Sequence, residues 1–193
     1  MNAGDGADVA AIQEGYDQSS TRTSLAHRLS SDTGFPTNIK NSMIDADMAC
    51  VLIGVNDWTY SWTPFGDVEG TDENVNTFCG AIRYIQHKLD DMLGNQMPIV
   101  FMTPIKRHKS GTIEYPPTDE NKWTDSNITI DYTKTNKYGK TLEDYANAIK
   151  TICSNKPRTY VIDLYHMCKF DPNNENHRNL YFPDGTHPTT IGH

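Results

Sequence analysis

Three short, mainly apolar runs stand out along the chain. They are Ala46–Val55, Met97–Thr103 and Arg158–Leu164. Continuous apolar runs bounded by turn residues are typical of strands in a parallel sheet, which other elements cover on both faces. We therefore predict three buried strands, with Ala46–Val55 buried on both of its faces.

Two segments between these runs have the helical spacing of apolar residues. In Asn74–Leu93, apolar side chains recur every three or four positions, and Gly94 follows as an end signal. Thr141–Cys153 repeats the pattern and opens with a threonine and two acidic residues, as helix N-termini favour. The alternation of strand and helix predicts an α/β fold, a three-layer α/β/α sandwich of flavodoxin-like type with a parallel sheet and helices on both faces.

Two long stretches without regular periodicity interrupt this alternation, Trp58–Gly70 and Lys106–Lys140. Each follows a predicted strand, so we expect both at the carboxyl edge of the sheet, where parallel α/β folds bind ligands. Both are rich in aromatic residues. Two interpretations stay open: the rings line a sugar or acyl pocket, or they cover the edge of the core and fill a partner interface.

Composition narrows the function classes. The 193-residue chain has a formal net charge of −8, which argues against a non-specific nucleic-acid binder because such proteins need a basic surface. No apolar run approaches the roughly 20 residues that span a bilayer.

The first residues lack the pattern of a signal peptide, which leaves a secreted location open if the N-terminus is truncated. The four cysteines include no Cys-x-x-Cys pair, so we interpret them as buried thiols and not as a zinc site or disulfide framework.

Two short motifs carry candidate chemistry. Gly54-x-Asn56-Asp57 ends the first predicted strand, where Asn56 offers an amide donor for an oxyanion and Asp57 can fix the loop by accepting backbone donors. Asp184-x-x-His187 lies on a turn-rich segment, where the carboxylate can orient the imidazole for proton transfer. Each motif alone is also common turn chemistry, and a metal site there lacks a further ligand.

In this order and on these elements, the two motifs resemble the SGNH hydrolases, also called the GDSL-type lipase and esterase superfamily. That family contributes Ser, Gly, Asn and His from blocks in chain order. Gly54 to Asp57 match its third block, Asp184 and His187 match its last, and the resemblance extends over most of the chain. It implies that Asn56 is an oxyanion donor, that His187 is the general base, and that Asp184 orients His187.

The first two blocks match less well. The resemblance assigns the second-block glycine to Gly4, in segment 2–6, whose backbone N–H is then a second oxyanion donor. The chain contains no Gly-Asp-Ser, and none of the serines in segment 19–31 follows a predicted buried strand. We therefore expect residues 1–193 to form a single SGNH-hydrolase-like domain, truncated at both ends, whose nucleophile lies in a missing segment or a second chain.

The resemblance implies ester hydrolysis through an acyl-enzyme, with no cofactor and no metal. It implies a small-molecule or glycan ester as substrate. Trp58, Tyr60 and Trp62 cluster beside Asn56 in the sequence and favour a carbohydrate acetyl ester, with Trp58 and Asp57 as substrate-binding residues. The alternative is a catalytically inactive domain of the same fold that binds carbohydrate or has a structural role. A nucleotide- or flavin-binding protein is disfavoured because no phosphate loop follows a first strand.

Overall fold

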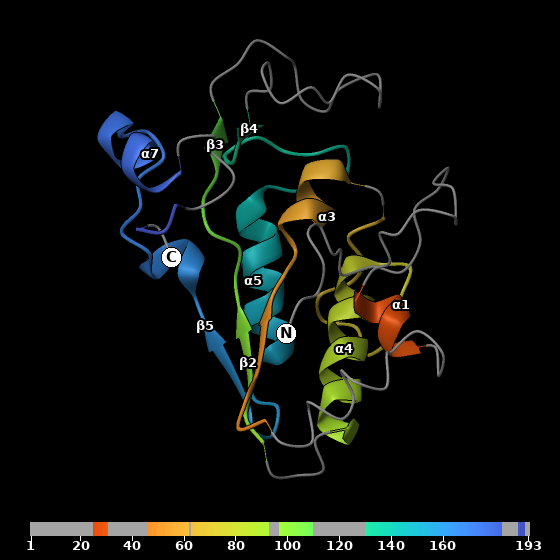
Figure 1. The fold of residues 1–193 in the computed structure, drawn as a ribbon. Helices are drawn as coiled ribbons and strands as arrows, with labels where there is room; N and C mark the ends of the chain where they lie inside the picture. The colour runs from red at the N-terminus through yellow and green to blue at the C-terminus, as the bar shows by residue number, and fades with distance from the viewer. Residues whose placement is uncertain are drawn as a thin grey trace.

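A parallel sheet forms the centre of the molecule (Figure 1). The computed structural model describes residues 25–30, 46–61, 63–92, 97–109, 130–182 and 189–191. In this part of the chain three parallel strands pair in the order β1-β2-β5, and they are β1 (Ala49–Leu52), β2 (Ile99–Met102) and β5 (Thr159–Ile162). Because the strands are parallel, their carboxyl ends meet at one edge, which is the upper edge in Figure 1.

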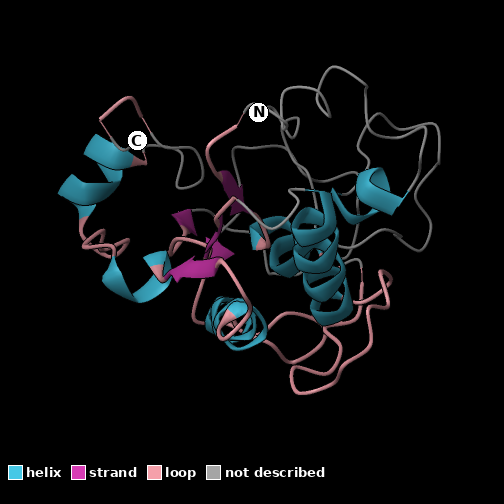
Figure 2. Cartoon of the chain, turned by 90° about the horizontal axis from the view of Figure 1, so that it is seen from below, coloured by secondary structure: helices cyan, strands magenta, loops and turns pink. Residues whose placement is uncertain are grey.

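Two long helices form the crossovers between these strands. Helix α4 (Phe78–Met92) connects β1 to β2, and helix α5 (Leu142–Cys153) lies between β2 and β5 in the chain. Helix α5 begins with a capping box, in which the Thr141 hydroxyl accepts from the Asp144 N–H at 3.2 Å and the Asp144 carboxylate accepts from the Thr141 N–H at 2.7 Å. Figure 2 shows the strands near the centre with helices around them. The predicted parallel α/β fold is confirmed.

The core lies between the sheet and the inner faces of α4 and α5. Phe78 and Tyr145 are fully buried, and their ring centroids are 4.5 Å apart. Phe65 joins them with its ring centroid 4.9 Å from that of Tyr145. Val51 and Phe101 face these rings from the strands and are also buried. Each such side chain stabilises the fold by about 1.5–3 kcal/mol through burial of apolar surface.

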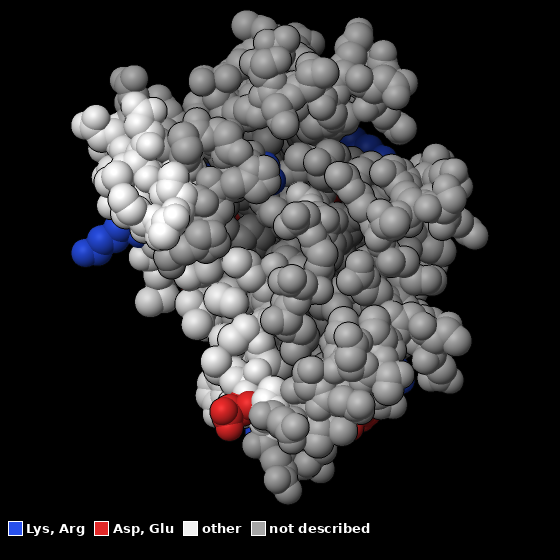
Figure 3. All heavy atoms as spheres, in the orientation of Figure 1, with Lys and Arg blue, Asp and Glu red and all other residues white. Residues whose placement is uncertain are grey.

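The opposite face of the sheet carries exposed apolar side chains. Leu52, Tyr160 and Ile162 are 51%, 60% and 44% exposed, whereas Val51 on the inner face is 6% exposed. In Figure 3 the described surface over the strands is mostly uncharged. The prediction that Ala46–Val55 is buried on both faces is therefore wrong for β1, whose positions alternate between buried and exposed. A continuous apolar run does not distinguish a covered face from an open apolar one.

The segment after β1 also differs from the prediction. Helix α3 (Val55–Tyr60) follows the strand almost directly, so the predicted irregular stretch Trp58–Gly70 begins inside a helix. Helix α1 (Leu25–Ser30), which was not predicted, contacts α4. Neither helix has the long amphipathic repeat that made α4 and α5 recognisable, since each is only six residues long.

Short elements complete the described part of the chain. In the predicted stretch Lys106–Lys140, β3 (His108–Lys109) pairs antiparallel with β4 (Ile130–Asp131). Helices α6 (Leu164–Met167) and α7 (Glu175–Tyr181) follow β5. None of the helices in the described ranges is long and apolar enough to cross a membrane.

Candidate active site

Gly54 turns the chain out of β1 in a left-handed conformation. Its φ angle is 109°, a region that residues with a Cβ rarely adopt. A Cβ at this position would lie 3.2 Å from Phe78 Cε2 and 3.6 Å from Ile149 Cδ1. The backbone angle and the close approach of the core both favour glycine here. The next residue, Val55, starts helix α3.

Asn56 lies in the first turn of α3, at the carboxyl end of β1 (Figure 1). The residues that follow it, Asp57, Trp58 and Thr59, are only 3%, 0% and 2% exposed, whereas Asn56 is half-buried. Positions 56 and 58 are about 200° apart around a helix, so an inward Trp58 turns Asn56 to the opposite side. A partly exposed amide at this edge of a parallel sheet is a donor that a substrate carbonyl can reach.

Burial changes the interpretation of Trp58. The Trp58 side chain has no exposed surface, and its Nε1–H donates to the Lys140 carbonyl at 3.2 Å. A sugar cannot stack on a ring enclosed by the core, so the prediction that Trp58 binds substrate is wrong. Asp57 is 3% exposed, and its role in substrate binding stays a prediction. In the first turn of α3, a carboxylate stabilises the positive end of the helix dipole.

The other predicted site residues, Gly4, Asp184 and His187, lie outside the described residues. Among the described residues on either side of positions 184 and 187, the Thr189 N–H donates to the Tyr181 carbonyl at 2.8 Å. This bond holds Thr189 against the last turn of α7. That His187 meets Asn56 in one cleft stays a prediction.

The buried hydroxyl and thiol groups of the core are not available as nucleophiles. The Ser61 side chain is fully buried, and its hydroxyl donates to a main-chain carbonyl at 2.9 Å. Burial raises the pKa of Cys79 and of Cys153 to about 12, which keeps both thiols protonated. All four cysteines are free thiols, as predicted, but Cys50 is exposed and Cys168 partly exposed, so burial was predicted correctly for two of them.

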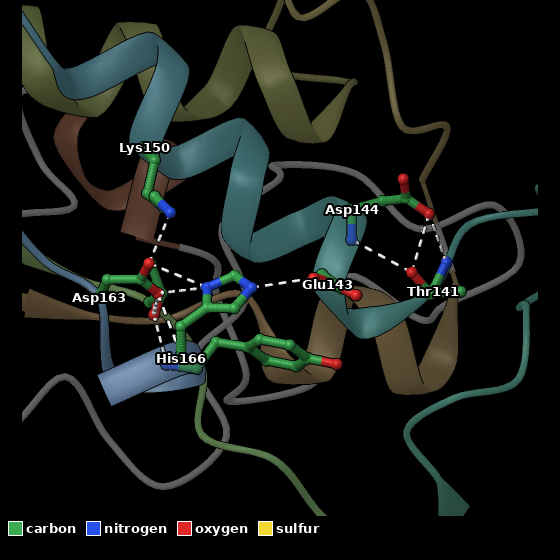
Figure 4. A network of polar contacts seen from close by, with 8 residues as sticks. Thr141, Glu143, Asp144, Lys150, Asp163 and His166 are labelled. Carbon is green, nitrogen blue, oxygen red and sulfur yellow. Dashed lines mark hydrogen bonds and ion pairs between the residues drawn. The ribbon is translucent and has the colours of Figure 1, made fainter. Parts of the chain in front are cut away.

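A charged cluster that the sequence analysis did not identify lies at the carboxyl end of β5 (Figure 4). Lys150 Nζ donates to Asp163 Oδ2 at 2.5 Å. His166 Nδ1–H donates to Asp163 Oδ2 at 2.9 Å, and His166 Nε2–H donates to Glu143 Oε1 at 2.8 Å. These four residues form the His166 cluster. A sequence signal for it exists, because Asp163-x-x-His166 has the same spacing as the predicted pair in segment 184–187 and also follows a strand.

The two carboxylates of the His166 cluster favour the protonated form of its imidazole. The hydrogen bond to Glu143, and after it the bond to Asp163, raises the pKa of His166 above its ordinary value of 6.5. A protonated imidazole donates from both ring nitrogens and has no lone pair to accept a proton, so this arrangement does not favour His166 as a general base. Burial acts to raise the pKa of Asp163, but hydrogen bonds from Lys150 and His166 outweigh it and lower that pKa. Among the described side chains, no group of three or more His, Cys, Asp or Glu is placed to hold a metal ion.

Comparison with known proteins supports the fold. No family model and no curated protein matches the chain. One crystal structure is 28% identical to it, with 95% of this chain and 68% of the other covered and a TM-score of 0.66. A structural-genomics protein from Lactobacillus plantarum is 21% identical, with 95% of this chain and 71% of the other covered and a TM-score of 0.61.

A third solved structure has a functional name. A possible lipase from Chitinophaga pinensis is 29% identical, with 67% of this chain and 48% of the other covered and a TM-score of 0.48. Because less than half of that protein is covered, this similarity carries no argument about activity. The comparisons establish the α/β fold. An activity can be proposed only from the chemistry of the site residues.

Proposed function

We propose that this chain is part of an SGNH-type serine esterase that hydrolyses carboxylic esters through an acyl-enzyme. The observation that carries the proposal is the position of Asn56. Its partly exposed amide lies in the first turn of α3, at the carboxyl end of β1, directly before three buried residues. A donor that is fixed before the reaction stabilises the oxyanion of a tetrahedral intermediate without a reorganisation cost.

In the proposed reaction a serine hydroxyl attacks the ester carbonyl carbon, and His187 accepts the hydroxyl proton. Asp184 keeps the imidazole in one tautomer and stabilises the imidazolium. Asn56 and the Gly4 N–H donate to the oxyanion. The alcohol leaves with the proton from His187, and water then hydrolyses the acyl-enzyme by the same route. The serine comes from a segment outside these 193 residues or from a second chain.

The proposal specifies the bond that is cleaved, a carboxylic ester, and does not specify a sugar substrate. The preference for a carbohydrate ester rested on Trp58, Tyr60 and Trp62 together. The complete burial of Trp58 removes one of these three rings, and the side chains of the other two lie outside the described part of the chain. The second candidate function is a catalytically inactive domain of the same fold. One observation favours it, namely that the sequence contains no Gly-Asp-Ser.

Hydrolysis of p-nitrophenyl acetate and labelling with a fluorophosphonate probe test the proposal. We expect Asn56→Ala to lower kcat by about a hundredfold or more. His187→Ala should cost at least as much and abolish labelling. Asn147→Ala, at an exposed position of α5, is the control and should change neither. These assays use the complete protein together with any partner chain. Mass analysis of the labelled peptide then identifies the chain that carries the serine, whereas a folded complete protein that neither reacts nor hydrolyses the ester supports the inactive domain.

A further inference from the structure

Helix α3 is too short to hold Asn56 in place by itself. It has six residues, begins at Gly54 without a side-chain cap, and ends at Ser61, which is left-handed with φ 52°. Isolated helices shorter than about 12–15 residues are marginal in water. The position of α3, and therefore of Asn56, must come from contacts with the rest of the molecule.

Trp58 provides two of these contacts, one through its side chain and one through its main chain, and Thr59 accepts another from Arg107 Nη1 at 3.2 Å. The Trp58 indole Nε1–H donates to the Lys140 carbonyl at 3.2 Å, and the Trp58 carbonyl accepts from Asn136 Nδ2 at 3.4 Å. Both partners belong to the loop 136–140, which leads into α5. Trp58, Asn136 and Lys140 form the Trp58 clamp. The clamp connects the end of β1 to the start of α5 across about 80 positions of sequence.

Asn136 uses its whole side-chain amide in this clamp. Besides the bond to Trp58, its Nδ2 donates to Tyr145 Oη at 3.0 Å, and its Oδ1 accepts from the N–H groups of Tyr138 at 3.0 Å and Lys140 at 3.2 Å. A primary amide has two donor hydrogens and two acceptor lone pairs, so its capacity is filled. The two N–H partners also fix which side of the amide carries the oxygen. Asn136 is only 5% exposed, so water does not replace these partners.

We propose that Asn136 is the positioning residue for Asn56: it fixes α3 through Trp58 and so keeps the oxyanion donor in place. This inference rests on the proposed function, and Asn136 itself touches neither substrate nor reacting atoms. Asn56 is two residues before Trp58 in the same helix, so a displacement of Trp58 moves Asn56 with it. Misplacing a catalytic group by about 1 Å can cost about a hundredfold in rate.

Asn136→Asp removes the hydrogen bond to Trp58 while keeping the bonds within the loop 136–140. A carboxylate keeps the two acceptors for the N–H groups of Tyr138 and Lys140, so the loop retains its internal bonds. It presents an oxygen where the N–H donated to Trp58, and two acceptors then face each other. Asn147→Ala, on the exposed side of α5, is the matched control.

The first measurement needs no activity. We expect Asn136→Asp to shift the NMR signals of the Asn56 side-chain NH₂ group and to speed hydrogen exchange of the α3 amides. The control should leave both unchanged. If Asn136→Asp does not fold, Asn136→Ser carries the test, because it also removes the Nδ2 donor to the Trp58 carbonyl. Unchanged Asn56 signals and unchanged exchange in a folded variant would overturn the inference.

The second measurement separates positioning from simple stabilisation. We expect Asn136→Asp to lower kcat by about tenfold or more, with KM unchanged, because the donor is displaced and not the substrate. In an Asn56→Ala background the same substitution should have no further effect on kcat. Additive losses would contradict a role through Asn56. If Asn56→Ala alone leaves kcat unchanged, the proposed function fails, while the NMR result still decides whether the clamp holds α3.

Discussion

The Trp58 clamp and the His166 cluster lie at the same edge of the sheet but are built from different chemistry. The clamp consists of the Trp58 indole and carbonyl after β1 and of amide and carbonyl groups in the loop 136–140, and none of its hydrogen bonds involves a charge. The cluster consists of the Asp163 carboxylate and the His166 imidazole after β5, and of the Glu143 carboxylate and the Lys150 ammonium of α5. The clamp should therefore hold its geometry over a wide pH range, whereas the cluster should respond to pH and to salt.

Burial sharpens this difference. Asn136 is 5% exposed, whereas the side chains of His166 and Glu143 are 39% and 50% exposed. A buried donor or acceptor left without its partner costs about 1–3 kcal/mol. A solvent-exposed ion pair contributes about 0–1 kcal/mol and is screened by salt. The part of the edge next to Asn56 is thus the rigid part, as pre-organised oxyanion stabilisation requires.

The largest effect on stability is expected at the centre of the clamp. Trp58→Ala removes a completely buried ring together with its bond to Lys140, and should lower the free energy of unfolding by about 3–5 kcal/mol. Urea denaturation at neutral pH measures the change. His166→Ala is the matched variant on the other side and should cost about 1 kcal/mol or less. Equal losses of unfolding free energy in the two variants would contradict the proposed difference between the clamp and the cluster.

A smaller effect is expected at the start of α3. Gly54→Ala adds a Cβ to a residue in the left-handed conformation and places it 3.2 Å from the Phe78 ring. The substitution should therefore lower the free energy of unfolding by about 1–3 kcal/mol. Gly139→Ala, in the loop of the clamp, has a φ of 68° but no atom within 4 Å of the added Cβ. It should therefore cost only the backbone strain, about 1 kcal/mol. Thermal unfolding of both variants tests this order, and a reversed order would mean that the Phe78 ring moves aside freely.

Local sequence predicted the parallel sheet and the two long helices because each carries its own periodicity. The start of α5 was predicted for the same reason, since the capping box of Thr141 and Asp144 lies within four residues. Helix α3 was missed because Val55–Tyr60 contains β-branched and short polar residues with modest helix propensity. What makes it helical is the burial of Trp58 and its bonds to a loop far away in sequence, which no window of local sequence contains.

The candidate site was predictable only in part. The apolar run before Asn56 placed it at the end of a strand, and the structure has it at the carboxyl end of β1. The role of Trp58 was wrong because an aromatic residue among polar neighbours has the same sequence pattern whether it is exposed or buried. Two Asp-x-x-His pairs follow the third strand, and spacing alone does not tell which one is structural. The contacts to Glu143 and Lys150 identify the pair ending in His166 as part of a salt-bridge network.

The smallest effect is the pH dependence of the His166 cluster. The pKa of His166 is raised in the fold, so its contribution to stability is fully present below the ordinary value of 6.5 and is lost as pH rises through the raised value. The pKa of Asp163 is lowered, so its contribution is present above the ordinary value of 3.8 and is lost as pH falls through the lowered value. The cluster therefore stabilises the fold most between these two ordinary values, 3.8 and 6.5.

Comparison of His166→Gln with Trp58→Phe at two pH values isolates this effect. The free energy of unfolding lost by His166→Gln should be larger at about pH 5.5 than at about pH 9, because only the protonated imidazole donates to both carboxylates. His87, whose pKa is raised by its hydrogen bond to Glu73, titrates in wild type and variant alike and cancels in the difference. Trp58→Phe loses a neutral hydrogen bond, so its cost should be the same at both values. If the loss of unfolding free energy in His166→Gln did not change with pH, the cluster would be as insensitive to protonation as the clamp. The difference between the two regions would then consist of burial alone.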